Sequence, residues 1–564
     1  MKKTFLLTSV VLAFSACSFL DLTPTVISKE TFYKSEVEAR YGLAGVYGAM
    51  SHESFYGNFY SQMISNTDDL SYFNRPVQAS TALPQYHFDA GNEYIRQAWT
   101  RMYRGIRNAN AFMEAISVSE FDPDGALYAE ARFLRAYYHF LLAEAWGDVP
   151  LRDKEVKDHG GVLSAATPQA DVLRWCAAEM EDCLNKLSTS TDLLPSRINR
   201  AVAEGILARV YLFMAGESVQ GMDKTACFKS ARDHADAVIQ SQSYRLNPDY
   251  SQVFINMIED AYDTEYRESM WEVEFLGDRS SASSWSNGRI GDVLGLQSTG
   301  STGYSSFRCN YSYGMYNGSL KLWELYWQKD RTADETTQNV ITDVRQNWNM
   351  APYNYAGSSS WAPYGVPGSG SSRASIDKTP YVYNSVTTTM DPTAAQAIRN
   401  CGKFRREVDY EGVKDSKRLY TTINYPLLRY ADILLMYAEA ANEYEGAPSD
   451  KAYDCLKQVR DRAGIKTLEK TEYDQASFRE LVRNERGREL CFESLRKYDL
   501  IRWGIFVEAM REYGQAAEDE RWSKHATAAY VASIADAVQP RHIYLPLPLE
   551  ELGVNSLLVQ NPLW

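Results

Sequence analysis

Residues 424–446 constrain the fold more than any other stretch, because they predict a helix that is apolar on nearly every side. One wide helical stripe holds Tyr430, Ile433, Leu434, Tyr437, Ala438 and Ala441. Leu428 and Leu435 lie outside this stripe, so the helix needs neighbours on at least two sides. Pro426 suits the first turn, where an N–H is not needed, and Gly446 marks the end.

A second helix follows directly. Ser449 can cap its start, and Gly464 ends it. An antiparallel pair of this kind is the unit from which helical repeats are built. Tyr138 and Tyr211 lie in similar local sequences 73 residues apart, which is about twice the ~34-residue tetratricopeptide period. The pattern therefore favours a helical-repeat scaffold.

Motifs along the chain resemble those of the SusD/RagB family of outer-membrane nutrient-binding lipoproteins. In chain order they are Leu428–Asp432, Ala438–Ala440, Val459–Gly464, Glu485–Leu490, Arg496–Gly504 and Tyr544–Glu551. The resemblance covers nearly the whole chain from Cys17 to Trp564. The sequence departs from the family at Ser494 and Leu563, where Gly is common, and at Ser556, where Pro often stands.

The resemblance implies a mainly α fold. Tetratricopeptide-like helix pairs would form the scaffold, and a long loop-rich, aromatic-rich insertion would carry few short strands. It also implies a partner, a SusC-like TonB-dependent outer-membrane transporter that the protein caps. The implied location is the outer membrane, with the body of the protein exposed at the cell surface.

The N-terminus has the pattern of a lipoprotein signal peptide. Lys2 and Lys3 precede an apolar run that is too short to span a bilayer, and small residues come just before Cys17. This arrangement resembles a lipobox, in which the signal peptide is cut before the cysteine and the sulfur is acylated. The alternative is an ordinary secretory signal followed by a chance cysteine. The lipobox predicts a lipid anchor at Cys17.

Composition indicates a large exported body that does not bind nucleic acid. The 564 residues are 45% hydrophobic, which is enough for a substantial core. The net charge is −14, and no Lys and Arg stripe is interleaved with aromatics, so nucleic acid is excluded as a partner. The cysteines after Cys17 lack CxxC spacing, which argues against a disulfide framework or a zinc site.

The expected helices fall into two blocks separated by a different kind of sequence. Helices are expected at 30–50, 94–117, 126–146, 168–187, 198–216 and 226–241. From Asp278 to Met390 the chain is instead rich in Gly, Ser, Thr and aromatics, as functional insertions are. The predicted organisation is a signal peptide (1–16), an N-terminal segment (17–93), a first helical block (94–277), a ligand-binding insertion (278–423) and a second block with the C-terminal segment (424–564).

Catalytic chemistry has little support in the sequence. The histidines are scattered, and there is no GxSxG, P-loop or dinucleotide motif, so neither a metal nor a cofactor is predicted. Asp68 with Asp69, or Glu485 with Glu489, could be a glycosidase carboxylate pair. A solvated or ligand-binding loop for the first pair and a structural pair around Arg486 for the second are favoured. We therefore predict that the protein is not an enzyme.

Binding of a ligand at the protein surface is the function that remains. Sugar binders combine flat aromatic rings with forked hydrogen-bonding groups. The polar, turn-rich stretch Asn66–Pro76 is expected to be a loop that meets the insertion on one side of the scaffold. The predicted ligand-binding residues are Asn66, Asp68, Tyr72, Arg75, Trp285 and Trp361. For any single aromatic residue the alternative role is packing of the insertion onto the helices.

Two functions stay open at this point. The first is capture of oligosaccharide or polysaccharide for uptake through the transporter. The second is binding of peptides or proteins by a helical-repeat lipoprotein. The sequence names neither the sugar nor its linkage, because stacking on aromatic rings tolerates many sugars.

Overall fold

The structure is a computed structural model. It describes residues 33–117, 120–156, 163–276, 286, 288–297, 312–326, 343–351, 353–356, 360–363, 399–406, 420–518, 523 and 526–564. Side chains are described for these residues apart from 353–356, 360–363 and 526.

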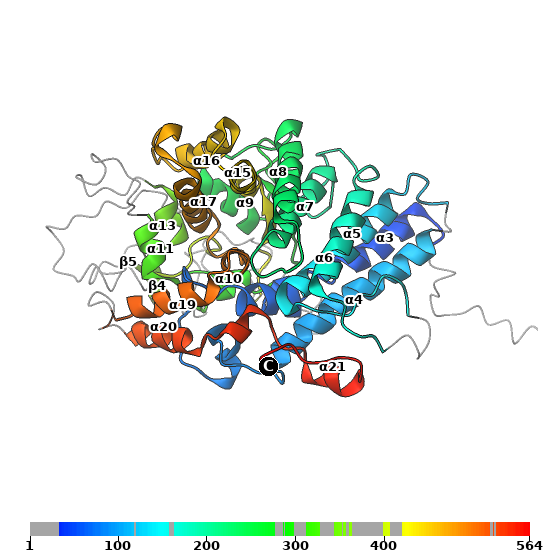
Figure 1. The fold of residues 1–564 in the computed structure, drawn as a ribbon, viewed down its shortest axis with the longest axis horizontal. Helices are drawn as coiled ribbons and strands as arrows, with labels where there is room; N and C mark the ends of the chain where they lie inside the picture. Colours follow the sequence, from blue (N-terminus) through cyan, green and yellow to red (C-terminus); the bar gives the residue numbers. More distant parts are fainter. Residues whose placement is uncertain are drawn as a thin grey trace, which may run out of the picture.

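Helices from the first half of the chain pack against one another in sequence order (Figure 1). They are α3 (Glu36–Tyr47), α4 (Glu93–Ile116), α5 (Ala126–Trp146), α6 (Gln169–Cys183), α7 (Arg200–Met214) and α8 (Lys224–Ser241). Side chains cap several of them; Asn92, for example, accepts the N–H groups of Tyr94 and Ile95 at 3.0 and 3.3 Å. The expected helices of the first block are confirmed, with small shifts at their ends.

The stretch at 424–446 begins as a strand and continues as a helix. Tyr425–Arg429 is β6, which pairs antiparallel with β2 (Ser269–Val273). The prediction that Pro426 lies in the first turn of the helix is wrong. Pro426 lies opposite Glu272, next to a break in the strand register, where a missing N–H is tolerated.

Helix α15 (Tyr430–Glu445) follows and is enclosed as expected. Every side chain from Tyr430 to Asn442 is buried. Gly446, at a φ of 76°, ends the helix, and Ser449 caps the next one by accepting the Ala452 N–H at 3.3 Å.

The two helical blocks form one stack, because α15 packs on α8 (Figure 1). The second block continues with α16 (Asp450–Arg462), α17 (Gln475–Leu490), α18 (Arg496–Arg502), α19 (Phe506–Ala516), α20 (Ala526–Ala537) and α21 (Leu549–Val554). Within the described part of the chain, no helix has both the length and the apolar character needed to cross a membrane.

Short elements lie between the blocks. The helices are α9 (Tyr250–Ile258), α10 (Ile290–Val293), α11 (Leu320–Leu325) and α13 (Arg345–Asn349). The strands are β3 (Tyr316–Gly318), β4 (Tyr353–Ala356) and β5 (Ser360–Pro363). Antiparallel pairs β1–β3, β2–β6 and β4–β5 form three two-stranded sheets, where β1 is Ser71–Phe73. The mainly α fold with few short strands is confirmed.

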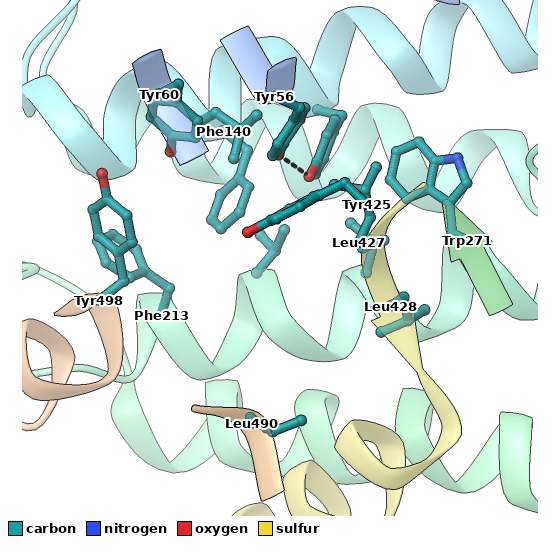
Figure 2. Packing of buried hydrophobic residues seen from close by; sticks show 14 of the residues in the cluster. Tyr56, Tyr60, Phe140, Phe213, Trp271, Tyr425, Leu427, Leu428, Leu490 and Tyr498 are labelled. Atoms are coloured by element: carbon teal, nitrogen blue, oxygen red, sulfur yellow. Dashed lines mark hydrogen bonds between the residues drawn. The ribbon is translucent and has the colours of Figure 1, made fainter. Parts of the chain in front are cut away.

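Aromatic side chains fill the space where the blocks meet the N-terminal segment (Figure 2). Tyr56 stacks on Tyr425 of β6 with ring centroids 5.6 Å apart, and its hydroxyl lies 2.6 Å from that of Tyr137 on α5. Trp271 of β2 packs against Tyr137 from the other side. Residues distant in the sequence therefore share one core.

A buried ion network joins α17 to β6, α16 and α13. Glu489 accepts hydrogen bonds from Arg429 at 3.0 Å, from Arg462 at 2.7 Å and from Arg345 at 2.9 Å. Glu485, one turn earlier on α17, accepts from Arg345 at 2.6 Å. All five side chains are nearly inaccessible to solvent. Charges taken out of water persist only when each has its partners, so these contacts fix the elements together.

Two of the departures from the family sequence occur at left-handed backbone positions. Ser494 has a φ of 60° and Leu563 a φ of 76°. Glycine adopts this conformation without steric cost, which explains why it is common there in the family. At Ser494 the side-chain hydroxyl donates to the Ser61 carbonyl, a contact that glycine could not make.

We predict that Glu489→Gln destabilises the protein by about 3–5 kcal/mol, because it removes the negative charge that three buried arginines share. Chemical denaturation measures this change. Glu480→Gln on the same helix is the matched control, since the Glu480 side chain is 63% exposed and its ion pair with Arg483 lies at the surface. The control should lose less than about 0.5 kcal/mol. Equal losses in the two variants would contradict the central role of the network.

Candidate functional site

The stretch Asn66–Arg75 and the insertion meet, as expected, at the end of the β1–β3 sheet. Asn74 follows β1, and its backbone N–H donates to the Met315 carbonyl at 2.8 Å. Its side-chain amide donates to the Asn317 side chain at 2.7 Å and to the Gly314 carbonyl at 2.9 Å. Asn400 donates to the same two oxygens, at 2.8 and 3.0 Å. Three asparagine side chains therefore hold the turn before β3.

The turn itself has little freedom. Gly314 has a φ of 52°, and a Cβ there would lie 2.7 Å from the Gln297 nitrogen, so a larger residue does not fit. Buried Asp292 accepts the Tyr313 N–H at 3.3 Å and is itself paired with Arg289 at 2.8 Å. The backbone on both sides of Tyr313 is thus fixed in advance of any ligand.

Tyr313 and Arg75 form the candidate site, which we call the Tyr313–Arg75 edge. Tyr313 is 37% exposed, and the Arg75 guanidinium donates to the Tyr313 carbonyl at 2.7 Å and to the Asn74 carbonyl at 3.2 Å. An aromatic ring offers a flat face for an apolar sugar surface, and a guanidinium offers forked donors for hydroxyl or carboxylate oxygens. The edge therefore supplies both kinds of group that sugar recognition uses.

Three of the predicted ligand-binding residues lie in the core. Asn66, Asp68 and Tyr72 are at most 1% exposed, and Tyr72 accepts a hydrogen bond from Asn317 at 3.1 Å. The expected loop over Asn66–Pro76 is interrupted by the strand β1, and residues 66–73 are buried rather than solvated. Enclosed side chains do not reach a ligand at the surface, so among these residues only Arg75 stays a candidate for direct contact.

The other predicted residues are less fully described. Trp361 lies on β5, where the structure describes only the backbone. Trp285 and Cys17 lie outside the described residues. The ligand-binding roles of the two tryptophans therefore stay predictions.

Among the aromatic residues of the insertion whose side chains are described, Tyr313 is exposed, Tyr420 is half-buried and the others, including Trp348, are buried. Trp348 is buried beneath Arg405, whose guanidinium lies 4.0 Å from the ring centroid. Aromatic residues at helical spacing are predicted by that spacing to lie in the core, and Trp99, Tyr137, Trp323, Tyr326 and Trp503 are buried. Tyr211 is partly buried and stacks on His234.

Neither candidate carboxylate pair is arranged for hydrolysis. Burial alone would raise the pKa of Glu485, but Arg345, Arg488 and Arg460 lower it to about 2. Glu489 is held ionised by Arg462, Arg429 and Arg345 in the same way. A general acid needs a raised pKa and access to substrate, and these glutamates have neither. The structural role expected for this pair is confirmed.

Asp68 and Asp69 are neighbours in the core just before β1, and their pKa values are shifted in opposite directions. Burial and the neighbouring Asp69 raise the pKa of Asp68 to about 7, although the Leu70 and Ser71 N–H groups donate to it. Burial would also raise the pKa of Asp69, but the positive charges of Arg496 at 2.8 Å and Lys321 at 2.7 Å hold this pKa below its usual value. Both carboxylates thus serve the packing of β1.

Within the described residues, no group of three or more His, Cys, Asp or Glu side chains could hold a metal ion. Sequence reasoning missed the asparagine cluster and did not place Tyr313 among the predicted ligand-binding residues. The Ser312–Gly314 turn, with a glycine next to an aromatic residue, was the only local signal.

The SusD family matches this chain over residues 267–564, more than half of its length. The chain belongs to the SusD family. A second family, described as starch-binding and associating with the outer membrane, matches residues 18–212. The two matches cover most of the chain and leave only residues 213–266 between them, so the resemblance seen in the motifs is confirmed.

Relatives cover almost the whole chain. A SusD-like protein from Formosa agariphila is 24% identical, and the alignment covers 97% of this chain and 95% of the relative. Another from Bacteroides ovatus is 24% identical over 94% of this chain and 87% of its own. The solved SusD homologue from Bacteroides thetaiotaomicron superposes with a TM-score of 0.80 at 25% identity, covering 96% and 99% of the two chains.

We predict that Asp68→Asn makes stability depend less on pH. Between about pH 4 and pH 7 the folded protein keeps a proton on Asp68 that the unfolded chain releases. The contribution of Asp68 to the free energy of unfolding therefore falls as pH rises. The wild type should therefore lose up to about 1.4 kcal/mol per pH unit more than the variant in this range. Denaturation at pH 5 and pH 7 measures the difference.

Glu272 and Glu144 are also buried with raised pKa values, so only the difference between wild type and variant reports on Asp68. Asp124→Asn, at an exposed turn before α5, is the control and should match the wild type. A variant with an unchanged pH profile would show that Asp68 is ionised in the fold.

Proposed function

We propose that this protein is a cell-surface lipoprotein that binds oligosaccharide or polysaccharide and delivers it to a partner TonB-dependent outer-membrane transporter. The observation that carries the proposal is the Tyr313–Arg75 edge. It is a preformed pair of an aromatic ring and a guanidinium, and it lies where the stretch Asn66–Arg75 meets the aromatic-rich insertion. Membership of the SusD family supports the same ligand class.

The names of structural neighbours add support for glycans. One is a laminarin-binding SusD-like protein with a TM-score of 0.65 at 19% identity, covering 94% of this chain and all of its own. Another is surface glycan-binding protein A from Bacteroides uniformis, with a TM-score of 0.63. The fold is shared with both, and the ligand class is carried to this chain as part of the proposal.

The way in which the carboxylates are used supports binding without catalysis. The two pairs that resembled a glycosidase site lie in the core and are engaged by arginine, lysine or backbone donors. Ligand would leave the protein unchanged and pass to the transporter. Acylation at Cys17 would keep the body of the protein at the membrane while this transfer takes place.

We predict that the chain from Ser18 to Trp564, which contains both helical blocks, binds glycans rather than peptides when applied to arrays of each. Tyr313→Ala should weaken binding of the best glycan about fivefold to tenfold, because a stacking platform contributes about 1 kcal/mol. Isothermal titration calorimetry measures the affinity. Trp285→Ala and Trp361→Ala test the two further platforms in the same way.

Tyr41→Ala is the matched control for this experiment. Tyr41 lies on α3 and is 64% exposed, so its loss should change neither the affinity nor the melting temperature. Selective binding to peptides would replace the glycan proposal with the peptide alternative. Unchanged glycan affinity in Tyr313→Ala, with an intact melt, would remove the Tyr313–Arg75 edge from the site.

We predict that Cys17 is the acylated residue. Cells fed an alkynyl fatty acid should label the wild-type protein but not Cys17→Ala, because the lipid is attached through this sulfur. Cys227→Ser is the control and should keep the label. Label retained in Cys17→Ala would assign the acyl group to another residue.

A further inference from the structure

A groove of about 360 Å³ lies between α4, the segment Pro150–Val156 and α21. Figure 1 shows α21 beside the long helix α4, and the Leu549 N–H donates to the Ala90 carbonyl just before α4 at 2.9 Å. The groove shares no residue with the Tyr313–Arg75 edge. Glycan binding at the edge would therefore leave this groove unused.

Hydrogen bonds fix the walls of this groove. Tyr103 donates from its hydroxyl to the Pro150 carbonyl at 2.8 Å, and Asn110 donates to the Arg152 carbonyl at 3.0 Å. On the opposite side, Asn555 donates to the Ser164 carbonyl at 2.8 Å. A hollow whose walls are held in this way needs little rearrangement to accept a ligand.

The interior of the groove is aliphatic. Ile106, Leu558, Val156 and Val554 line it, and Val554 is 72% exposed. Trp99 and Ile106, at 2% and 1% exposure, offer almost no surface, and the half-buried Tyr103 is held by its hydroxyl against the Pro150 carbonyl, so Val156 and Val554 supply most of the accessible apolar surface. A sugar would place its hydroxyls against these aliphatic groups without partners, whereas a hydrocarbon chain would bury them favourably.

Positive charge predominates at the rim. Arg107, Arg152 and Lys154 line the groove, together with the two carboxylates of Glu155 and Glu551. Burial raises the pKa of Glu551 even though Arg152 is close to it. The rim therefore favours an anion next to the aliphatic interior.

We propose that this groove binds a single aliphatic chain that ends in an anionic head group. The chain would lie among Ile106, Val156, Val554 and Leu558, and the head group would meet Arg107, Arg152 and Lys154. A volume of about 360 Å³ is at the small end of ligand pockets, which suits one chain rather than a protein helix or strand. Such a chain can come from a free fatty acid or from an acidic lipid in a bilayer.

The test uses the chain from Ser18 to Trp564, which retains every residue of the groove, with decanoate as the probe in calorimetry. Decanoate should bind, and decyltrimethylammonium, which has the same chain and the opposite charge, should not. Val554→Asp should weaken decanoate binding by about tenfold or more, because it places a carboxylate beside the chain. Arg107→Glu should weaken it by about tenfold.

Val559→Asp is the matched control. Val559 belongs to the same C-terminal segment and is 81% exposed, but it does not line the groove. Its affinity for decanoate should equal that of the wild type, and all three variants should melt normally. Glycan affinity should be unchanged by Val554→Asp, so the outcome is independent of the proposed glycan site.

Sedimentation with phosphatidylglycerol vesicles separates the two sources of the ligand. Binding to these vesicles that Val554→Asp abolishes and Val559→Asp leaves intact would assign the groove to a membrane lipid. Decanoate binding alone would assign it to a free fatty acid. The proposal is overturned if neither probe binds, if decyltrimethylammonium binds as well as decanoate, or if the two valine variants behave alike.

Discussion

The buried ion network around Glu489 is the interaction on which the rest of the structure depends. Arg429 occupies its centre, with hydrogen bonds to Glu489 at 3.0 Å, to Glu493 at 2.8 Å and to Glu268 at 3.0 Å. Such a set of charges is stable in the core only when every member is present, because removing one leaves the others desolvated and unpaired. The network therefore favours a single arrangement of strands β2 and β6 against helix α17.

This arrangement also positions the proposed ligand site, the Tyr313–Arg75 edge. Arg345 connects the network to α13, and Lys403, which donates to Glu493 at 2.6 Å, connects it to the segment 399–406. Asn400 of that segment holds the turn that carries Tyr313. The exposed ring thus stands on a backbone that is fixed, through a few contacts, to the helical scaffold, which lowers the entropic cost of binding a ligand.

Sequence reasoning succeeded where the pattern is local and failed where the contacts are distant. The stripe of α15 and the cap at Ser449 depend on residues within a few positions of one another, and both were predicted. Asn66, Asp68 and Tyr72 have the polar, turn-rich surroundings of a loop, but pairing of β1 with β3 encloses them. The local sequence around β1 does not indicate that a partner strand lies so far along the chain. In the same way, the residues around Pro426 form a strand only because they pair with the distant β2.

The motifs that identify the family are largely the residues of the buried ion networks. Arg429 and Glu489 belong to the first, and a second joins Asp432, Arg486 and Asp499 through contacts of 2.7 and 2.8 Å. Such residues are specified by the scaffold, since a buried charge cannot change without its partners. The contacts that we propose for ligand selection lie instead on exposed side chains such as Tyr313, which can change at little cost in stability. Family membership therefore determines how this chain folds, while the identity of its glycan depends on residues outside those motifs.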